Sequence, residues 1–441
     1  MAFREDPAAG AATDYDVAVI GGGPAGATAA LCAARKGMRV ALLEQTKHPR
    51  FHIGESFLPR NMTLLRELGL EERVKRLPQT LKLGASFALG HETTPTDFFF
   101  EGGLLEATPD TFNIERAPFD RLLLDCAREA GAQVVEDCTV REISRLSEHG
   151  VVLETHHGDG GRATVRARHL IDASGQSTVV GRQLKTRRTL PDRRRVAYYG
   201  HFRDVERFTD VKAGFPLVVM CREGWFWFIP IDEERMSIGL VVDADLAARA
   251  GVPAREMLAW GIARCPLARV RVRHAEWPPR NHVTADFSYT CKPYAGEGYF
   301  LVGDAATFVD PIFSTGVCLG MMSARTAVET IERIRDGRLS PHRGRSTYCR
   351  YVEQSSSVFF RLVRSYYRHS FRELFLHGYG PLRMHCAVIS ILCGHVFPRP
   401  RLALRWRLRL FEYLVKLQRL VPIVPRREQF SLLTGTLVSG R

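Results

Sequence analysis

The apolar positions of the N-terminal region form two short continuous runs with a helical segment between them. "VAVI" (17–20) and "VALLE" (40–44) have the unbroken apolar character of strands that are buried on both faces of a parallel sheet. Between them, Ala, Leu and Cys predict a helix whose small side chains pack closely on that sheet. The order of strand, turn and long helix recurs over 298–331, where "FLV" is the strand. These alternations predict an α/β fold.

The segment "GWFWFIP" (224–230) alternates with a period of two, which is typical of a strand. This period places Trp225 and Trp227 on one face and Phe226 and Phe228 on the other. The chain has only five tryptophans among its 441 residues, so two of them on one strand face need an explanation. A strand buried on both faces explains the run without any function, and this interpretation stays open.

From about Arg338 onward the chain becomes rich in Arg and aromatic residues at helical spacing. Within 402–421, a polar line comprises Arg405, Arg409, Glu412, Lys416 and Arg419. An apolar line at the same spacing comprises Leu404, Leu408, Phe411 and Val415. We expect one amphipathic helix that packs its apolar face on the rest of the chain. Peripheral membrane contact or docking of an acidic carrier protein are the alternatives.

The composition of the chain says more about its cellular environment than about its function. A chain of 441 residues can form two or three domains. Ten cysteines without a CxxC pair or metal-ligand spacing predict a reducing, cytoplasmic environment and no metal site. The net charge of +14 suits nucleic acid, an anionic membrane or an acidic protein, but no nucleic-acid-binding motif accompanies it. No secretory signal is expected in 1–14, and the apolar run 386–397 is shorter than the about 20 residues of a membrane span.

The turn after the first strand has the spacing of a dinucleotide-binding motif. Gly21 allows a tight turn, Gly23 lets the backbone approach a pyrophosphate, and Gly26 permits close contact between helix and sheet. Glu44 ends the second strand, where a carboxylate can accept hydrogen bonds from a ribose. The residues predicted to contact the dinucleotide here are Gly21, Gly22, Gly23, Ala25, Gly26 and Glu44.

Two later segments bear on which dinucleotide is bound. One strand ends at Asp172 and another is followed by Asp304, and an Asp at such a strand end can accept a hydrogen bond from a ribityl hydroxyl. The helix that begins near Gly316 and Val317 can direct its positive dipole end to the pyrimidine edge of a flavin. Arg116 opens another helix, from which a cation can reach the cofactor.

In the order GxGxxG, RxxFD, DASG and GDA, these motifs resemble the FAD-dependent monooxygenases of the aromatic hydroxylase type. The resemblance covers roughly residues 1–340 and implies FAD rather than NAD. It implies a mixed α/β fold in which a Rossmann-like FAD-binding module (1–340) is interleaved with a β-sheet substrate domain. We expect that substrate sheet at about 80–110 and 195–290, followed by a helical C-terminal region at 341–441.

Two further motifs, "RFHIGESFLP" (50–59) and WxWxIP at 225–230, together resemble the flavin-dependent halogenases. The resemblance implies that FADH2, O2 and chloride or bromide form hypohalous acid. It also implies that Glu55 contacts the cofactor. Trp225 and Trp227 would form a wall that separates the organic substrate from the flavin.

In this family a lysine beyond the wall holds the hypohalous acid by a hydrogen bond or as a chloramine. Lys82 in "LKLGASFALG" matches the family spacing, and its apolar surroundings would lower its pKa. Lys75, in the charged stretch "EERVKR", is the runner-up. The resemblance places the halide at the backbone N–H groups of Thr315 and Gly316, although that turn could serve FAD alone.

One departure from the family bears on the substrate. Tryptophan halogenases carry a Glu just before their STG turn, whereas this chain has Phe313. The resemblance therefore favours the branch that acts on phenols or pyrroles, free or carrier-tethered, in natural-product biosynthesis, over tryptophan. A single glycine motif provides no NADPH site, so we expect a separate flavin reductase. The alternatives are a flavin hydroxylase, an isoprenoid reductase of the geranylgeranyl type, and a flavin-binding protein without activity.

Overall fold

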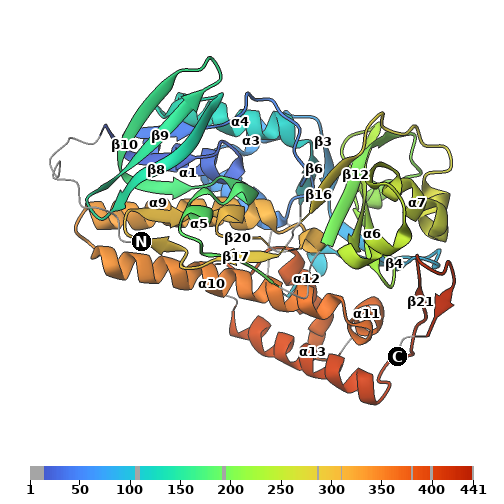
Figure 1. Ribbon diagram of the computed structural model, residues 1–441. Helices are drawn as coiled ribbons and strands as arrows, with labels where there is room; N and C mark the ends of the chain where they lie inside the picture. The colour runs from blue at the N-terminus through green and yellow to red at the C-terminus, as the bar shows by residue number, and fades with distance from the viewer. Residues whose placement is uncertain are drawn as a thin grey trace.

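The structure is a computed structural model that describes residues 14–104, 110–190, 195–285, 288–308, 310–378, 381–397 and 401–439. Its strands form two main sheets, and long helices run along both of them (Figure 1). The smaller elements that bear on the site are η1 (Phe100–Gly102), η6 (Gly303–Ala305), η7 (Pro311–Phe313), α2 (Pro59–Glu67), α3 (Glu71–Lys75) and α5 (Val179–Gln183).

The first sheet has eight strands and is built on the predicted apolar runs. Its path is β18 (Ala295–Gly296), β19 (Tyr299–Leu301), β10 (Arg162–Asp172), β1 (Tyr15–Ile20), β2 (Val40–Leu43) and β7 (Gln133–Val135). An antiparallel extension adds β8 (Cys138–Ser147) and β9 (Gly150–His157). The helices packed on this sheet include α1 (Pro24–Arg35), α4 (Arg116–Glu129) and α9 (Gly316–Arg335). Parallel register pairs Ile20 with Leu43 and with Asp172, so the carboxyl ends of three strands meet where the glycine turn begins.

The second sheet has seven strands drawn from two separate parts of the chain. Its order is β16 (His282–Ala285), β12 (Arg195–Arg203), β15 (Arg235–Asp243), β14 (Gly224–Pro230), β13 (Leu217–Met220), β4 (Gly84–Leu89) and β5 (Thr96–Phe99). Three small sheets complete the strands: β3 (Gln79–Lys82) with β6 (Thr111–Ile114); β11 (Arg187–Thr189), β17 (Tyr289–Cys291) and β20 (Thr307–Phe308); and β21 (Gln429–Phe430) with β22 (Leu437–Val438). The predicted mixed α/β fold, with one sheet interleaved into the other module, is confirmed.

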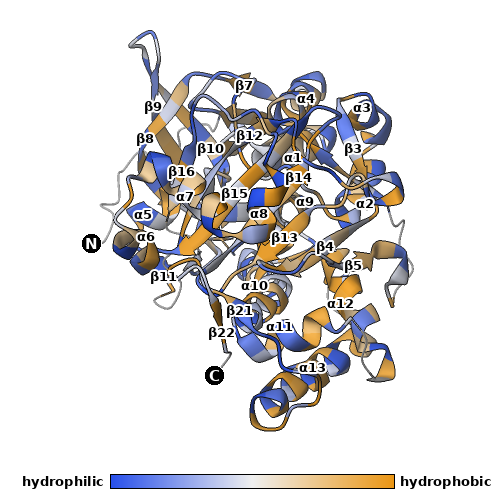
Figure 2. Ribbon diagram, turned by 90° about the vertical axis from the view of Figure 1, so that its right-hand side faces the viewer, coloured by the Kyte–Doolittle hydropathy of each residue, from blue (hydrophilic) through white to orange (hydrophobic). Residues whose placement is uncertain are grey.

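Strand β14 separates two cores, as its period of two predicts. Trp225 and Trp227 pack with the C-terminal helices, which lie below the strongly apolar strands β13, β14 and β15 in Figure 2. Phe226 and Phe228 pack on the other face, in a core with residues of α6 (Ala244–Ala250), α7 (Met257–Arg264) and α8 (Pro266–Arg271).

The C-terminal region is helical, as predicted, and comprises α10 (Pro341–Tyr366), α11 (His369–Leu376), α12 (Met384–Leu392) and α13 (Leu402–Leu420). Helix α10 joins the core of the first sheet to the core that contains the two indoles: Tyr348 donates to the carbonyl of Leu301 at 2.6 Å, and Phe359 packs with the two indoles. The division into domains at 340 stays a prediction. Among the described residues, no helix combines the length and the hydropathy needed to cross a bilayer.

Candidate functional site

The glycine turn brings backbone segments closer together than a side chain would allow. A Cβ on Gly21, whose φ is +98°, would lie 2.4 Å from the carbonyl oxygen of Ala173. A Cβ on Gly26 would lie 1.8 Å from the oxygen of Gly21. In contrast, a Cβ on Gly23 would meet only Nη2 of Arg50, at 3.8 Å. The start of α1 therefore faces open space beside a guanidinium, which suits a pyrophosphate. Sequence reasoning assigned no role to Arg50, although the motif at 50–59 begins with it.

Glu44 is buried at the end of β2 and binds the glycine turn itself. Its carboxylate accepts from the N–H of Gly22 at 2.6 Å and from the N–H and hydroxyl of Thr46 at 3.0 and 2.6 Å. Arg50 Nε lies 3.8 Å from the same carboxylate. Since an ionised carboxylate has about four acceptor positions, Glu44 retains capacity for the predicted ribose hydroxyl.

Asp304 and the start of α9 lie close together. The Cβ of Ala25 lies 3.3 Å from the Cβ position of both Gly303 and Gly320, so α1, η6 and α9 pack without intervening side chains. A Cβ on the exposed Gly316 would lie 3.9 Å from Oδ1 of Asp304.

The carboxyl group of Asp304 is half-buried, and among the described residues no side chain or amide donates a hydrogen bond to it. Desolvation raises the pKa of Asp304 to about 7, although the charge of Arg116 acts in the opposite direction. A carboxyl group without a hydrogen-bond donor fits a ligand that brings hydroxyl groups, as the ribityl chain of FAD does.

Arg116 does open a helix, but its guanidinium is already paired. It donates to both oxygens of Asp120 at 2.8 and 2.9 Å and to the carbonyl of Ile53 at 2.8 Å. The side chain thus fastens the loop at 52–54 to α4. The contact between Arg116 and the cofactor stays a prediction.

Glu55 lies in the same loop and contacts two different sheets. It is fully buried, and its Oε1 lies 2.8 Å from Nε2 of His201 on β12. Its backbone carbonyl accepts from Ile114 of β6 at 2.8 Å. Glu55 therefore connects the motif at 50–59 to the second sheet and to the small sheet of β3 and β6, a position that its role as a predicted cofactor contact did not anticipate.

Lys82 ends β3 and is only 3% exposed. Its Nζ donates to the carbonyl of Phe57 at 2.9 Å and lies 5.2 Å from the ring centroid of Phe100. Desolvation lowers the pKa of Lys82 to about 7, while the Cys393 thiol acts weakly in the opposite direction. Because Phe57 belongs to the GESFLP motif, the motif and the lysine are in direct contact.

Contrary to the prediction from the sequence, the apolar surroundings of Lys82 are not provided by its neighbours in the sequence. Its neighbour Leu81 is 48% exposed, because alternation along β3 turns Leu81 outward and Lys82 inward. The apolar environment is provided by Phe100 and the end of α12 instead. The runner-up, Lys75, lies on the exposed helix α3, as predicted, and pairs with Glu71 and Glu72, each at 3.1 Å.

Both indoles on β14 are buried with their N–H groups paired. Trp227 donates to Ser237 Oγ at 3.0 Å, and Trp225 donates to the Tyr367 hydroxyl at 2.9 Å. That hydroxyl donates in turn to Asp310 at 2.7 Å. A Cβ on Gly239 would lie 2.2 Å from the ring of Trp227, so only glycine at this position of β15 leaves room for the indole.

The turn at 310–316 is held in place by Asp310, which accepts from the N–H of Ile312 at 3.2 Å. Ser314 has a φ of +55°, and the buried Thr315 precedes the first residue of α9. The first N–H groups of a helix have no partner within the helix, so Thr315 and Gly316 can offer theirs to an anion. Phe313 is buried and packs edge to face on Tyr366 at 5.8 Å, and it places an apolar ring where the tryptophan halogenases carry a carboxylate.

One apolar cluster contains both indoles and side chains that lie next to other predicted reaction residues. It contains Phe313 beside the turn, Trp225 and Trp227 on β14, and Phe100 beside Lys82. The sequence separates these four side chains by more than two hundred positions in total, and only the folded sheet joins them.

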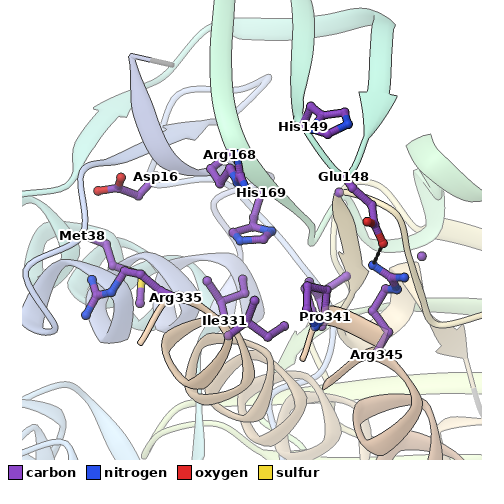
Figure 3. Close-up of a pocket in the computed structure, with 14 residues that line it drawn as sticks. Asp16, Met38, Glu148, His149, Arg168, His169, Ile331, Arg335, Pro341 and Arg345 are labelled. Carbon is purple, nitrogen blue, oxygen red and sulfur yellow. Dashed lines mark ion pairs between the residues drawn. The ribbon is translucent and has the colours of Figure 1, made fainter. Parts of the chain in front are cut away.

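A separate cavity of about 360 Å³ lies beside β10, the β8–β9 hairpin and helices α9 and α10 (Figure 3). Arg168, His169 and Ile331 line it, and Arg345 pairs with Glu148 at 2.6 Å at its edge. None of the predicted site residues lines this cavity. The residues predicted from the sequence therefore lie elsewhere in the fold.

Comparisons with known proteins agree with this arrangement. Residues 14–348 match the family model described as FAD binding domain. The chain is 28% identical over 422 residues to a 1H-pyrrole-2-carbonyl-[peptidyl-carrier protein] chlorinase of Pseudomonas fluorescens, covering 90% of this chain and 92% of that protein. It is 31% identical over 363 residues to a tryptophan 2-halogenase of Chondromyces crocatus, covering 81% and 68%. Its structure superimposes on the flavin-dependent brominase Bmp2 with a TM-score of 0.80 at 27% identity, covering 91% and 99%.

Proposed function

The chain belongs to the flavin-dependent halogenases, and we propose that it halogenates a phenol or pyrrole ring that a carrier protein presents as a thioester. The enzyme uses FAD and a halide. When bound, reduced FAD and O2 supply the oxidising power that converts chloride or bromide to hypohalous acid. The observation that carries the proposal is a buried lysine in contact with the GESFLP motif, beside the apolar cluster of the two indoles.

Residues of the first sheet hold the cofactor in this proposal. Gly23 and Arg50 face the pyrophosphate, Glu44 binds the ribose, and Asp304 accepts from the ribityl chain. Gly21, Gly22, Ala25, Gly26, Glu55, Arg116 and Val317 complete the cofactor site by shaping its backbone or contacting FAD. The halide binds at the N–H groups of Thr315 and Gly316, at the positive end of α9.

Lys82 receives the hypohalous acid. With a pKa of about 7, it is present in both protonation states near neutral pH. The ammonium can donate a hydrogen bond to the acid, and the neutral amine can react with it to form a haloamine and water. Trp225 and Trp227 keep the ring away from the flavin, so that the halogen rather than oxygen reaches it.

The apolar Phe313 supports a substrate whose aromatic ring is activated by the substrate's own hydroxyl group or pyrrole nitrogen. A carboxylate next to the halide turn, which would assist attack on an unactivated indole position, is replaced by an apolar ring here. The Pseudomonas fluorescens relative acts on a carrier-bound pyrrole, which supports the tethered form of the substrate. We also propose a separate flavin reductase and a cytoplasmic setting.

The test is aerobic turnover with FAD, a flavin reductase and either chloride or bromide. The substrates are pyrrole-2-carboxylate and simple phenols, each offered free and as a carrier-bound thioester. We expect a product with the isotope pattern of one added halogen, detected by mass spectrometry. A gain of one oxygen instead would assign the chain to hydroxylation, and no change in any substrate would refute the proposal.

A further inference from the structure

Helix α13 exposes a line of apolar and basic side chains on its outer face. Leu402, Trp406, Arg409, Tyr413, Lys416 and Leu420 follow one another at i, i+4, i+7, i+11, i+14 and i+18. At about 100° per residue these positions fall within a strip about 80° wide and about 27 Å long. We call this strip the α13 seam. Its apolar members are unusually open to solvent for their size: Leu402 is 76% exposed, Leu420 76%, Tyr413 61% and Trp406 42%.

The opposite face of α13 fixes the seam in its outward position. Leu404, Leu408, Phe411 and Val415 are buried, as the sequence predicted. Gln418 is also buried, donates to Glu373 of α11 at 2.8 Å, and accepts from the N–H groups of Ile423 and Val424. The helix lies at the outer edge of the molecule in Figures 1 and 2, and its ribbon in Figure 2 alternates between hydrophobic and hydrophilic bands. The outward faces of these apolar side chains therefore remain open to solvent, although the guanidinium of Arg407 lies 4.2 Å from the ring centroid of Trp406.

The charged side chains of the α13 seam are all basic. Arg409 and Lys416 form no ion pair with any described residue, and Arg405 lies alongside them on the same flank. The acidic residue of this helix, Glu412, lies 3.7 Å from Arg361 of α10. An incoming partner thus meets aromatic and aliphatic side chains interleaved with unpaired cations.

We propose that the α13 seam is the docking surface for the carrier protein that delivers the substrate, and that it receives an acidic, amphipathic helix of that carrier. This inference rests on the proposed function, because it names the partner of the same reaction. Acidic side chains of the carrier pair with Arg409 and Lys416, and an apolar side chain lies between Trp406 and Tyr413. Complementary charge of this kind sets partner choice and the rate of association.

The distribution of charge favours a protein helix over a lipid bilayer as the occupant. A membrane-bound helix separates its apolar and charged faces. Here Arg409 and Lys416 lie on the same line as Trp406 and Tyr413, so inserting the rings into lipid would draw the cations toward the hydrocarbon. An acidic helix pairs with those cations and covers the rings at the same time.

The position of the seam suits delivery to Lys82. Helix α12 packs on α13 and also on the η1 turn. The amide of Leu104, which follows η1, donates to Ser390 Oγ of α12 at 2.7 Å and also to the Cys386 carbonyl. Phe100 of η1 lies under Nζ of Lys82. Two packed helices, α13 and α12, with roughly 8–10 Å between their axes, therefore lie between the docking surface and the reaction site. An extended prosthetic arm that carries a thioester can pass beside these helices.

The experiment compares one acyl group in two forms. The first is 1H-pyrrole-2-carbonyl bound to a peptidyl carrier protein of Pseudomonas fluorescens, and the second is the same acyl group on N-acetylcysteamine. Halogenation is measured for the wild type, for Arg409→Glu/Lys416→Glu and for Tyr413→Ala, which removes a ring without changing charge. The control is Arg249→Glu/Arg269→Glu, two exposed arginines of α6 and α8 on the other side of the second sheet. FAD content and circular dichroism establish that each variant is folded.

We expect KM for the carrier-bound substrate to rise about tenfold or more in both seam variants, with kcat/KM for the small thioester unchanged and the control like the wild type. Equal effects of the seam and control variants would overturn the proposal, as would unchanged kinetics on the carrier-bound substrate. If the seam variants lose binding to phosphatidylserine vesicles but retain carrier turnover, the surface belongs to a membrane and the proposal is wrong. Loss of docking with retained halogenation of the small thioester leaves the proposed function standing, whereas the proposed function itself is refuted when the wild type halogenates neither of these pyrrolyl substrates nor any phenol.

Discussion

Burial of the Lys82 amine should make the enzyme less stable at neutral pH, and Lys82→Met should relieve that cost. In the folded protein the pKa of this amine is about 7, compared with 10.5 for an ordinary lysine. A difference of this size corresponds to about 5 kcal/mol. The unfolded chain binds the proton at any pH below 10.5, whereas the folded chain binds it only below about 7. Stability therefore rises with pH between these two values, and the full cost applies below the lower one.

The substitution also removes a hydrogen bond. Met has a similar length but cannot donate to the Phe57 carbonyl, and an unpaired buried carbonyl costs about 1–3 kcal/mol. We therefore expect Lys82→Met to raise the free energy of unfolding by about 1–3 kcal/mol at pH 7. The gain should shrink by about 1.4 kcal/mol for each pH unit and vanish between about pH 8 and 9.

Urea denaturation at pH 7, 8 and 9, followed by tryptophan fluorescence with FAD present, measures this dependence. The matched control is Lys75→Met, because Lys75 is exposed on α3 and its ion pairs raise rather than lower its pKa. The control should show no trend over this pH range. A constant difference between the wild type and Lys82→Met at all three pH values would refute the reasoning, since it would mean that the buried amine does not change its protonation there.

Three other substitutions test separate parts of the site. Trp227→Phe should keep the protein folded and FAD bound but lower the amount of halogenated product per O2 consumed, because it thins the wall. An unchanged ratio of halogenated product to released peroxide would leave the indole as a packing residue. Gly239→Ala should destabilise the protein by about 1–3 kcal/mol, since its Cβ would lie 2.2 Å from the Trp227 ring, and a melting curve with unchanged midpoint would contradict this. Asp304→Asn should weaken FAD binding by about tenfold in a fluorescence titration, because a hydrogen bond to a charged group contributes about 1.5–3 kcal/mol; equal affinity would remove Asp304 from the cofactor site.

Local patterns were sufficient to predict the first sheet. The apolar runs at 17–20 and 40–44, the glycine turn and the strand before Gly303 each carry their signal within a few residues, and the structure confirms these elements. The period of two in 224–230 likewise gave the correct faces for the indoles.

The contacts that assemble the site could not be predicted, because they join distant parts of the chain. Glu55 meets His201 across 146 positions, and Trp225 meets Tyr367 across 142. The inward direction of Lys82 depends on the pairing of β3 with β6, which no neighbouring residue specifies. Gly239 did carry a signal, since a glycine inside a strand often marks the close approach of another group.

The central claim is that Lys82 delivers halogen to the substrate after hypohalous acid has formed, and a single-turnover experiment on Lys82→Ala tests it most directly. Enzyme with FADH2 is mixed with O2, bromide and the pyrrolyl thioester, in the presence and absence of monochlorodimedone as a trap for free hypobromous acid. The account predicts flavin reoxidation at the wild-type rate, bromination of the trap, and no brominated pyrrole, while Lys75→Ala behaves like the wild type. Brominated pyrrole at the wild-type yield from Lys82→Ala would contradict the account, because the halogen would then reach the ring without this lysine.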